Sequence, residues 1–436
     1  MPLVDARLGV TAGAEPLSGM PGRLALLRDR LDWPYGTQIL AIALAVRVAA
    51  AILVPDQHFA DAASYRSAAH SLWATGQLGD AIIMPLYPAL VGLVGAGWGQ
   101  LIVDIALSTL MVWLVHALTL AIFADRAAAF LAALATAFYP YFIFYALAGV
   151  TETLFIVLLL GAFVCWYRAH FAAAAVFTVL AILTRPTIDL LVPLLIVYFA
   201  LVIHRFSAAR TLRQLGAYVA IYAVLMAPWW LHNYRAYGTF VRLNLGGGIV
   251  FYSGNNAHNE TGGSLDTDSD RKQFAGIADP VARDRAMWDA GLAYIKSNPG
   301  RFIELAGLKF VRFWRPWPYA PAYSGRAYVV MSVLTFVPVL VLAIIYLGIW
   351  GWREIALTGP VLALIGYFTL VHVVLAASLR YRLPLEPFLI VLASVAVARL
   401  ARRWPASRSL LDRLAGEAAV PIHVDRQDLR ELRISR

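Results

Sequence analysis

Long apolar stretches constrain this chain more than any other feature of its sequence. A helix rises about 1.5 Å per residue, so roughly 20 apolar residues cross the hydrocarbon core of a bilayer, which is about 30 Å thick. Ten stretches approach or reach this length, and we expect a transmembrane helix in each: 36–54, 100–123, 127–147, 151–167, 171–184, 187–204, 214–231, 327–350, 356–377 and 383–400. The sequence therefore predicts an all-α polytopic membrane protein.

The composition also favours a membrane protein. Hydrophobic residues make up 61% of the chain and charged residues 14%, whereas soluble domains are closer to about a quarter charged. The net charge of +10 could suggest a nucleic-acid partner, but the arginines are spread between and beyond the apolar stretches, and the sequence has no nucleic-acid motif. We therefore expect no nucleic acid. Cys165, the only cysteine, excludes an intramolecular disulfide.

The distribution of arginines predicts the orientation in the membrane. If the N-terminus is cytoplasmic, the short inside loops contain Arg126, Arg168, Arg205 and Arg353, as the positive-inside rule requires. Residues 1–35 then form a cytoplasmic segment, and the first span is retained as a signal anchor. An even number of spans returns the chain to the cytoplasm, where 401–436 form a polar tail.

Two longer segments stay on the outer side. Residues 55–99, between the first two spans of the 36–231 region, should contain a short helix at 62–75. Residues 232–326 form a larger loop domain before the last three spans at 327–400. Its first half is rich in Gly and Asn, and its second half is helical. Asp279-Pro280 starts one helix and Asn298-Pro299 a second, which we expect on the outer membrane interface.

Ionisable residues cluster near the outer ends of the expected spans. Placing an ionisable side chain beside hydrocarbon has a high free-energy cost, so each of these residues is a functional candidate. They are Asp56, His58, Asp61, Glu152, Arg185, Asp189, Arg380 and Arg382. On the expected topology they lie in one thin layer beneath the outer loops.

This layer suits a reaction on a lipid-phosphate carrier. Arginine binds phosphate bidentately and stays charged, which suits Arg185, Arg380 and Arg382. A carboxylate at the same depth can accept the proton of an attacking hydroxyl, and Asp61 is the candidate base. Structural roles remain open: Asp61 and Glu152 could cap helices, Arg185 could snorkel, and Arg47 could pair with Asp104 inside the bundle.

Several short motifs follow one another along the chain: Asp61 with Tyr65, Pro85-Leu86-Tyr87-Pro88, Thr151-Glu152-Thr153, Arg185-Pro186, Pro228-Trp229, Asn233-Tyr234 with Gly238, Gly254-Asn255, Asn298-Pro299, and Arg380 to Pro384. In this order the sequence resembles the membrane glycosyltransferases of the GT-C fold, especially the bacterial protein-mannosyltransferase and aminoarabinose-transferase-like families (glycosyltransferase families 39 and 83). The resemblance covers most of residues 36–400. Ala62 departs from the pattern, because many relatives carry a second acidic residue there, and so does His232, where an arginine is common.

The resemblance implies an enzyme of the bacterial inner membrane. It would transfer a sugar from a polyprenyl-phosphate carrier to a periplasmic or extracellular glycan, lipid or protein. Asp61 would activate the acceptor or bind a divalent cation such as Mg²⁺ or Mn²⁺. We predict Glu152 as a second catalytic residue, or as a second ligand of that cation. The substrate-binding residues would be Arg185, Arg380, Arg382, Tyr65, Tyr87, His58, Asn233 and Asn255.

A transporter is the alternative from another functional class. A flippase for lipid-linked sugars could use the same arginines to guide the phosphate across the membrane. Transporters often have matched halves and polar residues at the membrane centre, whereas the candidate residues here gather at one face and the large outer loop is unpaired. These features favour the enzyme. An assembly subunit with a decayed site is a third interpretation.

Overall fold

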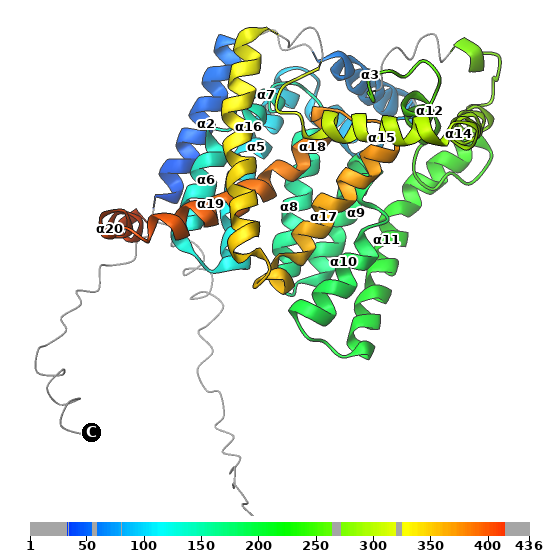
Figure 1. Ribbon diagram of the computed structural model, residues 1–436. Coiled ribbons are helices and arrows are strands. Elements are labelled where there is room, and N and C mark those ends of the chain that lie inside the picture. Colours follow the sequence, from blue (N-terminus) through cyan, green and yellow to red (C-terminus); the bar gives the residue numbers. More distant parts are fainter. Residues whose placement is uncertain are drawn as a thin grey trace, which may run out of the picture.

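A computed structural model describes residues 33, 35–54, 59–79, 81–263, 272–319 and 325–414. Within these ranges the chain is helical and has no strand. Most helices run side by side in one bundle, and a smaller group lies across one end of it (Figure 1). His58 and Asp56 lie outside the described residues.

Six helices are long and apolar enough to cross a membrane. They are α2 (Gly36–Leu53), α5 (Trp98–Phe123), α11 (Ala208–Tyr237), α16 (Arg326–Tyr346) with its π-helical end (Leu347–Gly351), α17 (Ile355–Val374), and α18 (Leu379–Arg382) joined to α19 (Glu386–Ala401). Shorter apolar helices in the described ranges are α6 (Arg126–Ala137), α8 (Glu152–Tyr167), α9 (Phe171–Thr184) and α10 (Val192–Tyr198) with its continuation to Ile203. These helices coincide with the ten apolar stretches. The polytopic all-α fold is confirmed, while ten crossings remain a prediction.

Helix α8 forms the centre of the bundle. Of its residues only Cys165 is not buried, and its neighbours include α5 and α9. A helix that is apolar on all sides has no face to offer to water, so it lies inside other helices. Glu152 begins α8 and is completely buried. This position makes a charge-compensating partner necessary.

Helices from the two long loops gather at one end of the bundle, where Figure 1 labels α3 (Ala60–Thr75), α12 (Gly247–Gly254), α14 (Pro280–Ser297) and α15 (Pro299–Trp314) together with α7 (Pro140–Tyr145). Helix α4 (Leu86–Val94) packs against α3. Helix α15 buries Leu305, Lys309 and Phe313, which recur every four residues on one face, and leaves Phe310 and Val311 exposed. The predicted break between α14 and α15 at Asn298-Pro299 is present.

Three local expectations need correction. The stretch at 127–147 is not one helix, because the chain bends between α6 and Pro140, the first residue of α7. Helix α3 begins at Ala60, so Asp61 lies in its first turn and does not cap it. Arg47 does not pair with Asp104. Its Nε donates to Ser108 Oγ (2.7 Å) and its Nη1 to two backbone carbonyls.

Candidate active site

Two arginines surround the buried Glu152 carboxylate. Arg185 donates from Nη1 to Glu152 Oε1 (2.5 Å) and to Thr151 Oγ1 (3.1 Å). Arg380 binds the same carboxylate through Nε and through Nη2, which lies 3.2 Å from Oε2. Charge-assisted hydrogen bonds of this kind compensate the loss of hydration around a buried ion. Glu152 therefore fixes the positions of both guanidinium groups.

Arg380 connects this buried pair to Asp61. Its Nη1 donates to Asp61 Oδ2, and its guanidinium lies 4.9 Å from the centre of the Phe59 ring. The Asp61 side chain is 50% exposed, whereas that of Glu152 is 0% exposed. The structure thus brings Asp61, Glu152, Arg185 and Arg380 into one ion-pair network, and only Asp61 presents a carboxylate to the surroundings.

The network borders a cavity of about 500 Å³, which we call the aromatic cavity. Asp61, Phe59 and Arg380 lie on its wall. The remaining lining comes from α7, α16 and α18 and from the segments after α15 and α17. It includes Tyr141, Phe144, Tyr145, Trp317, Tyr319, Tyr328, Met331 and Tyr381. Tyr328 and Met331 are each 41% exposed on α16, a helix apolar enough to face lipid. The cavity therefore connects a charged end with the apolar flank of the bundle.

Arg312 on α15 also lines the aromatic cavity, and the sequence analysis missed it. Its Nε donates to the Ala377 carbonyl (2.9 Å), its guanidinium lies 3.7 Å from the Tyr319 ring centre, and its buried Nη1 has no partner among the described residues. Burial lowers the pKa of Arg312. The sequence signal that could have identified it is the recurrence of Lys309, Arg312 and Arg315 at intervals of three residues on a helix beside the predicted site.

The charges in this region do not cancel. Asp61 and Glu152 are balanced by Arg185 and Arg380, so the ion-pair network has no net charge. Arg312 adds a positive charge to the same cavity without a carboxylate partner among the described residues. A partly buried cation without a carboxylate partner gains stability from a bound anion. This arrangement is suited to an anionic group such as phosphate.

The comparisons with known proteins bear on the fold. No family model matches the chain. No curated protein matches it either. Among solved structures, the oligosaccharyltransferase of Archaeoglobus fulgidus, crystallised with a tethered acceptor peptide, superposes with a TM-score of 0.53 over 86% of this chain and 51% of that one, at 13% sequence identity. The fold is GT-C-like. The chain spans about half the length of that oligosaccharyltransferase, and the narrower family resemblance remains a prediction.

Arg382 does not join the network in this GT-C-like bundle. It is fully buried, where its Nε donates to Glu386 Oε1 (2.9 Å) and its guanidinium lies 3.5 Å from the Phe336 ring centre. Its Nη1 donates to the Arg315 carbonyl (2.8 Å). Arg382 therefore ties the end of α15 to α19. Asp189 is also separate, paired with Arg242 at 2.6 Å.

Tyr65 and Tyr87 connect α3 to α4. Their rings meet edge to face with centroids 5.6 Å apart. The buried Tyr87 hydroxyl donates to Asp104 Oδ2 (2.7 Å) and accepts from Gln100 Nε2 (3.0 Å). These contacts occupy the Tyr87 hydroxyl. Neither tyrosine lines the aromatic cavity.

The two predicted asparagines hold backbone segments of the large loop. Asn233 donates to the Val241 and Leu243 carbonyls. Asn255 donates to the Val374 carbonyl (2.9 Å) at the end of α17 and accepts from Lys309 Nζ (2.8 Å). Burial lowers the pKa of Lys309 to about 8. Both asparagines are structurally engaged, and neither lines the aromatic cavity.

The side chains around Asp61 and Glu152 do not fit a divalent cation. Both carboxylates already bind guanidinium groups. Among the residues whose placement is described, no three His, Cys, Asp or Glu side chains gather as a metal site would require. Divalent magnesium and manganese need several oxygen ligands, which these two carboxylates do not supply.

Proposed function

We propose that the chain is a membrane glycosyltransferase of the bacterial inner membrane. It transfers a sugar from a polyprenyl-phosphate carrier to an acceptor on the outer side, a glycan, lipid or protein of the cell envelope. The observation that carries the proposal is the half-exposed Asp61 carboxylate, which Arg380 holds at the wall of a cavity. The same cavity is lined by Arg312, which has no carboxylate partner among the described residues. The GT-C-like fold is in keeping with it.

The reaction requires one bond to form and one to break. The acceptor hydroxyl oxygen attacks the anomeric carbon of the donor, and Asp61 takes up the hydroxyl proton. The bond between the anomeric carbon and the phosphate oxygen breaks, and its electron pair leaves with the carrier phosphate. Arg312 and Arg380 stabilise the negative charge on that phosphate. Asp61 is favoured over Glu152 as the base, because Glu152 is fully buried between two arginines.

The aromatic cavity suits a lipid-linked donor. A polyprenyl tail stays in hydrocarbon while its phosphate lies at headgroup depth. The exposed side chains of α16 would face the tail, and the charged end of the cavity would receive the phosphate and sugar. In this arrangement Glu152 and Arg185 hold Arg380 in place and do not contact the reacting atoms.

The test is a transfer assay with the purified full chain, a radiolabelled polyprenyl-phosphate sugar and a cell-envelope extract. We expect label to move from the carrier to an envelope component. If label stays on the carrier but crosses liposome membranes, the proposal is wrong and the chain is a transporter. The assay repeated with EDTA tests a metal requirement, and unchanged transfer argues against an ion.

Asp61→Asn should abolish most of this transfer. A general base contributes about 10²- to 10⁴-fold to a rate, so we expect a loss within that range while the helical content and thermal unfolding stay close to those of the unchanged protein. Asp289→Asn on the exposed side of α14 is the matched control and should transfer normally. Turnover of the Asp61 variant near the control value would remove Asp61 as the base.

A further inference from the structure

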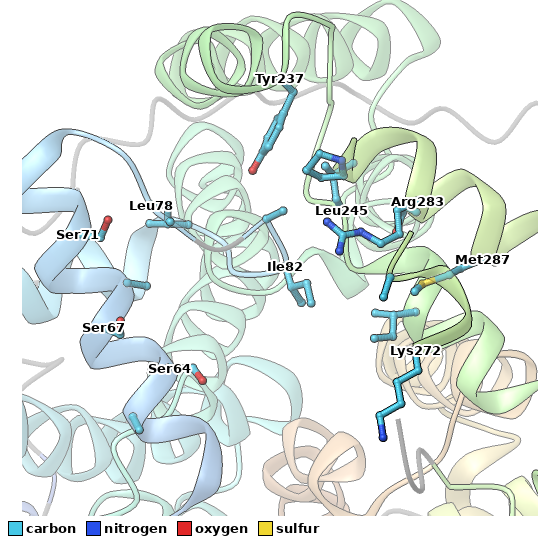
Figure 2. Close-up of a pocket in the computed structure, with 18 residues that line it drawn as sticks. Ser64, Ser67, Ser71, Leu78, Ile82, Tyr237, Leu245, Lys272, Arg283 and Met287 are labelled. Carbon is cyan, nitrogen blue, oxygen red and sulfur yellow. The ribbon is translucent and has the colours of Figure 1, made fainter. Parts of the chain in front are cut away.

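A second cavity lies beside the candidate active site and shares no lining residue with the aromatic cavity. Its volume is about 980 Å³, and we call it the serine cavity. Its walls come from α3, from the segment after α3, from the end of α11, and from α12 and α14 with the residues just before each (Figure 2). Every wall belongs to the outer end of the bundle (Figure 1). It therefore opens on the side where the proposed acceptor is found.

One wall offers hydroxyl groups. Ser64, Ser67 and Ser71 of α3 all line the cavity, and their spacing of three and four residues places them along one face over about 10 Å of helix. None of the three hydroxyls makes a hydrogen bond within the described part of the chain, and Ser64 and Ser67 are exposed. These hydroxyls can donate to and accept from a ligand that carries hydroxyl groups of its own.

The opposite wall is positively charged, as Figure 2 shows for Arg283 and Lys272. Neither makes an ion pair with a described residue. The carboxylate of Asp284 also lines the cavity, but it accepts a hydrogen bond from the Gly248 backbone N–H (2.7 Å), and burial raises the pKa of Asp284. The cavity lining thus contains two cations, Arg283 and Lys272, and one carboxylate, Asp284, which already accepts a hydrogen bond from the backbone. The described lining favours a ligand with negative charge.

The serine cavity and the candidate active site meet within the first two turns of α3. Asp61 borders the aromatic cavity, and Ser64, three residues later, borders the serine cavity. Side chains three apart on a helix are neighbours, with Cβ atoms about 5–6 Å apart. A ligand held along the serine wall therefore ends next to the carboxylate that would accept its proton.

We propose that the serine cavity binds the acceptor, and that this acceptor is an acidic saccharide. Its sugar hydroxyls would bond to the serines, and its carboxylate or phosphate would bind Arg283 and Lys272. A plain lipid tail would leave the serine and arginine groups without partners, and a neutral glycan would leave both cations unpaired. This inference rests on the proposed transferase function and specifies its acceptor.

Equilibrium binding to the purified full chain without any donor tests this proposal. The probes are trigalacturonate, a phosphorylated maltotriose and neutral maltotriose, measured by titration calorimetry. We expect one or both acidic probes to bind at least about ten-fold more tightly than maltotriose, which corresponds to about 1.4 kcal/mol. The two acidic probes distinguish a carboxylate from a phosphate source. Equal binding of all three probes, or no binding of either acidic probe, would overturn the proposal.

Variants place the binding in the serine cavity. Arg283→Gln combined with Lys272→Gln should remove the preference for the acidic probes, and Ser67→Trp should weaken them by filling the cavity. Arg285→Gln is the matched control, because Arg285 is an exposed residue of the same helix that does not line the cavity. If Arg285→Gln weakens binding as much as the double variant, the acidic probes bind elsewhere and the proposal fails.

The transfer assay separates this proposal from the proposed function. If acidic saccharide binds but no sugar is transferred from a carrier, the serine cavity remains a binding site and the proposed transferase function is wrong. If transfer proceeds and the double variant has an unchanged acceptor KM, the transferase function stands and the proposed acceptor site is wrong.

Discussion

At the scale of single residues, the site depends on a buried carboxylate. Glu152 is charged at the buried start of α8 because Arg185 and Arg380 bind both of its oxygens. The same contacts fix Arg380 where it can hold Asp61. Glu152, which does not line the aromatic cavity, thus determines the position of Asp61, which does.

Removing Glu152 from its ion pair with Arg185 and Arg380 should lower the stability of the folded protein. Breaking a buried ion pair leaves an uncompensated charge and costs about 3–5 kcal/mol. We expect Glu152→Gln to lower stability by that amount and Glu152→Gln with Arg185→Met to recover part of it. Denaturant unfolding in detergent measures both. A double variant less stable than Glu152→Gln would show that Arg185 stabilises the bundle through other contacts.

Arg312 should contribute to donor binding. A hydrogen bond to a charged group contributes about 1.5–3 kcal/mol, so Arg312→Gln should raise the donor KM by about ten- to a hundred-fold. The acceptor KM should stay unchanged, because Arg312 does not line the serine cavity. Steady-state transfer kinetics with each substrate varied in turn provide the measurement. An unchanged donor KM would assign the phosphate to Arg380 alone.

At the scale of elements, helix α12 depends on a close backbone contact with the bundle. Helix α12 ends at Gly254 against the end of α17, where a Cβ on Gly254 would lie 1.7 Å from the Leu375 carbonyl oxygen. The Asn255 and Lys309 side chains then bond to the Val374 carbonyl. Glycine is required at this position because only a residue without a side chain permits the approach.

Gly254→Ala should therefore separate α12 from α17. The added methyl group overlaps backbone atoms that cannot move independently, so we expect a loss of about 1–3 kcal/mol, the range for overpacking. Gly307→Ala on α15 is the control, since a Cβ there meets nothing within 4 Å, and it should be neutral or stabilising by up to about 1 kcal/mol. Thermal unfolding compares them, and equal melting temperatures for the two variants would contradict the close approach.

At the scale of the whole molecule, the arrangement is polarised along the bundle. The ion-pair network, both cavities and helices α3, α12, α14 and α15 share one end, while α20 (Pro405–Leu414) lies toward the other (Figure 1). The arginine-rich short loops predict that the end with the cavities faces away from the cytoplasm.

Cysteine labelling can measure this orientation. In a Cys165→Ser background, a cysteine at Asp289 on α14 should react with a membrane-impermeant maleimide applied from outside. A cysteine at Ser207, before α11, should react only after the membrane is permeabilised, because the arginines around that loop keep it cytoplasmic. The opposite labelling pattern would invert the topology and place the cavities on the cytoplasmic side.

Composition and segment length along the chain were enough to predict the class of fold and the approximate position of each apolar helix, because the free energy of transfer into hydrocarbon depends on local composition and length. The sequence also predicted Asp61, Glu152, Arg185 and Arg380 as candidate site residues, since a charged side chain beside a span has a high free-energy cost wherever the helices lie. The structure joins these four residues in one ion-pair network. Only the tertiary structure separated Arg382 from them, added Arg312 and revealed the serine cavity. These features depend on which faces of distant helices meet, and that is decided by packing between segments far apart in the chain.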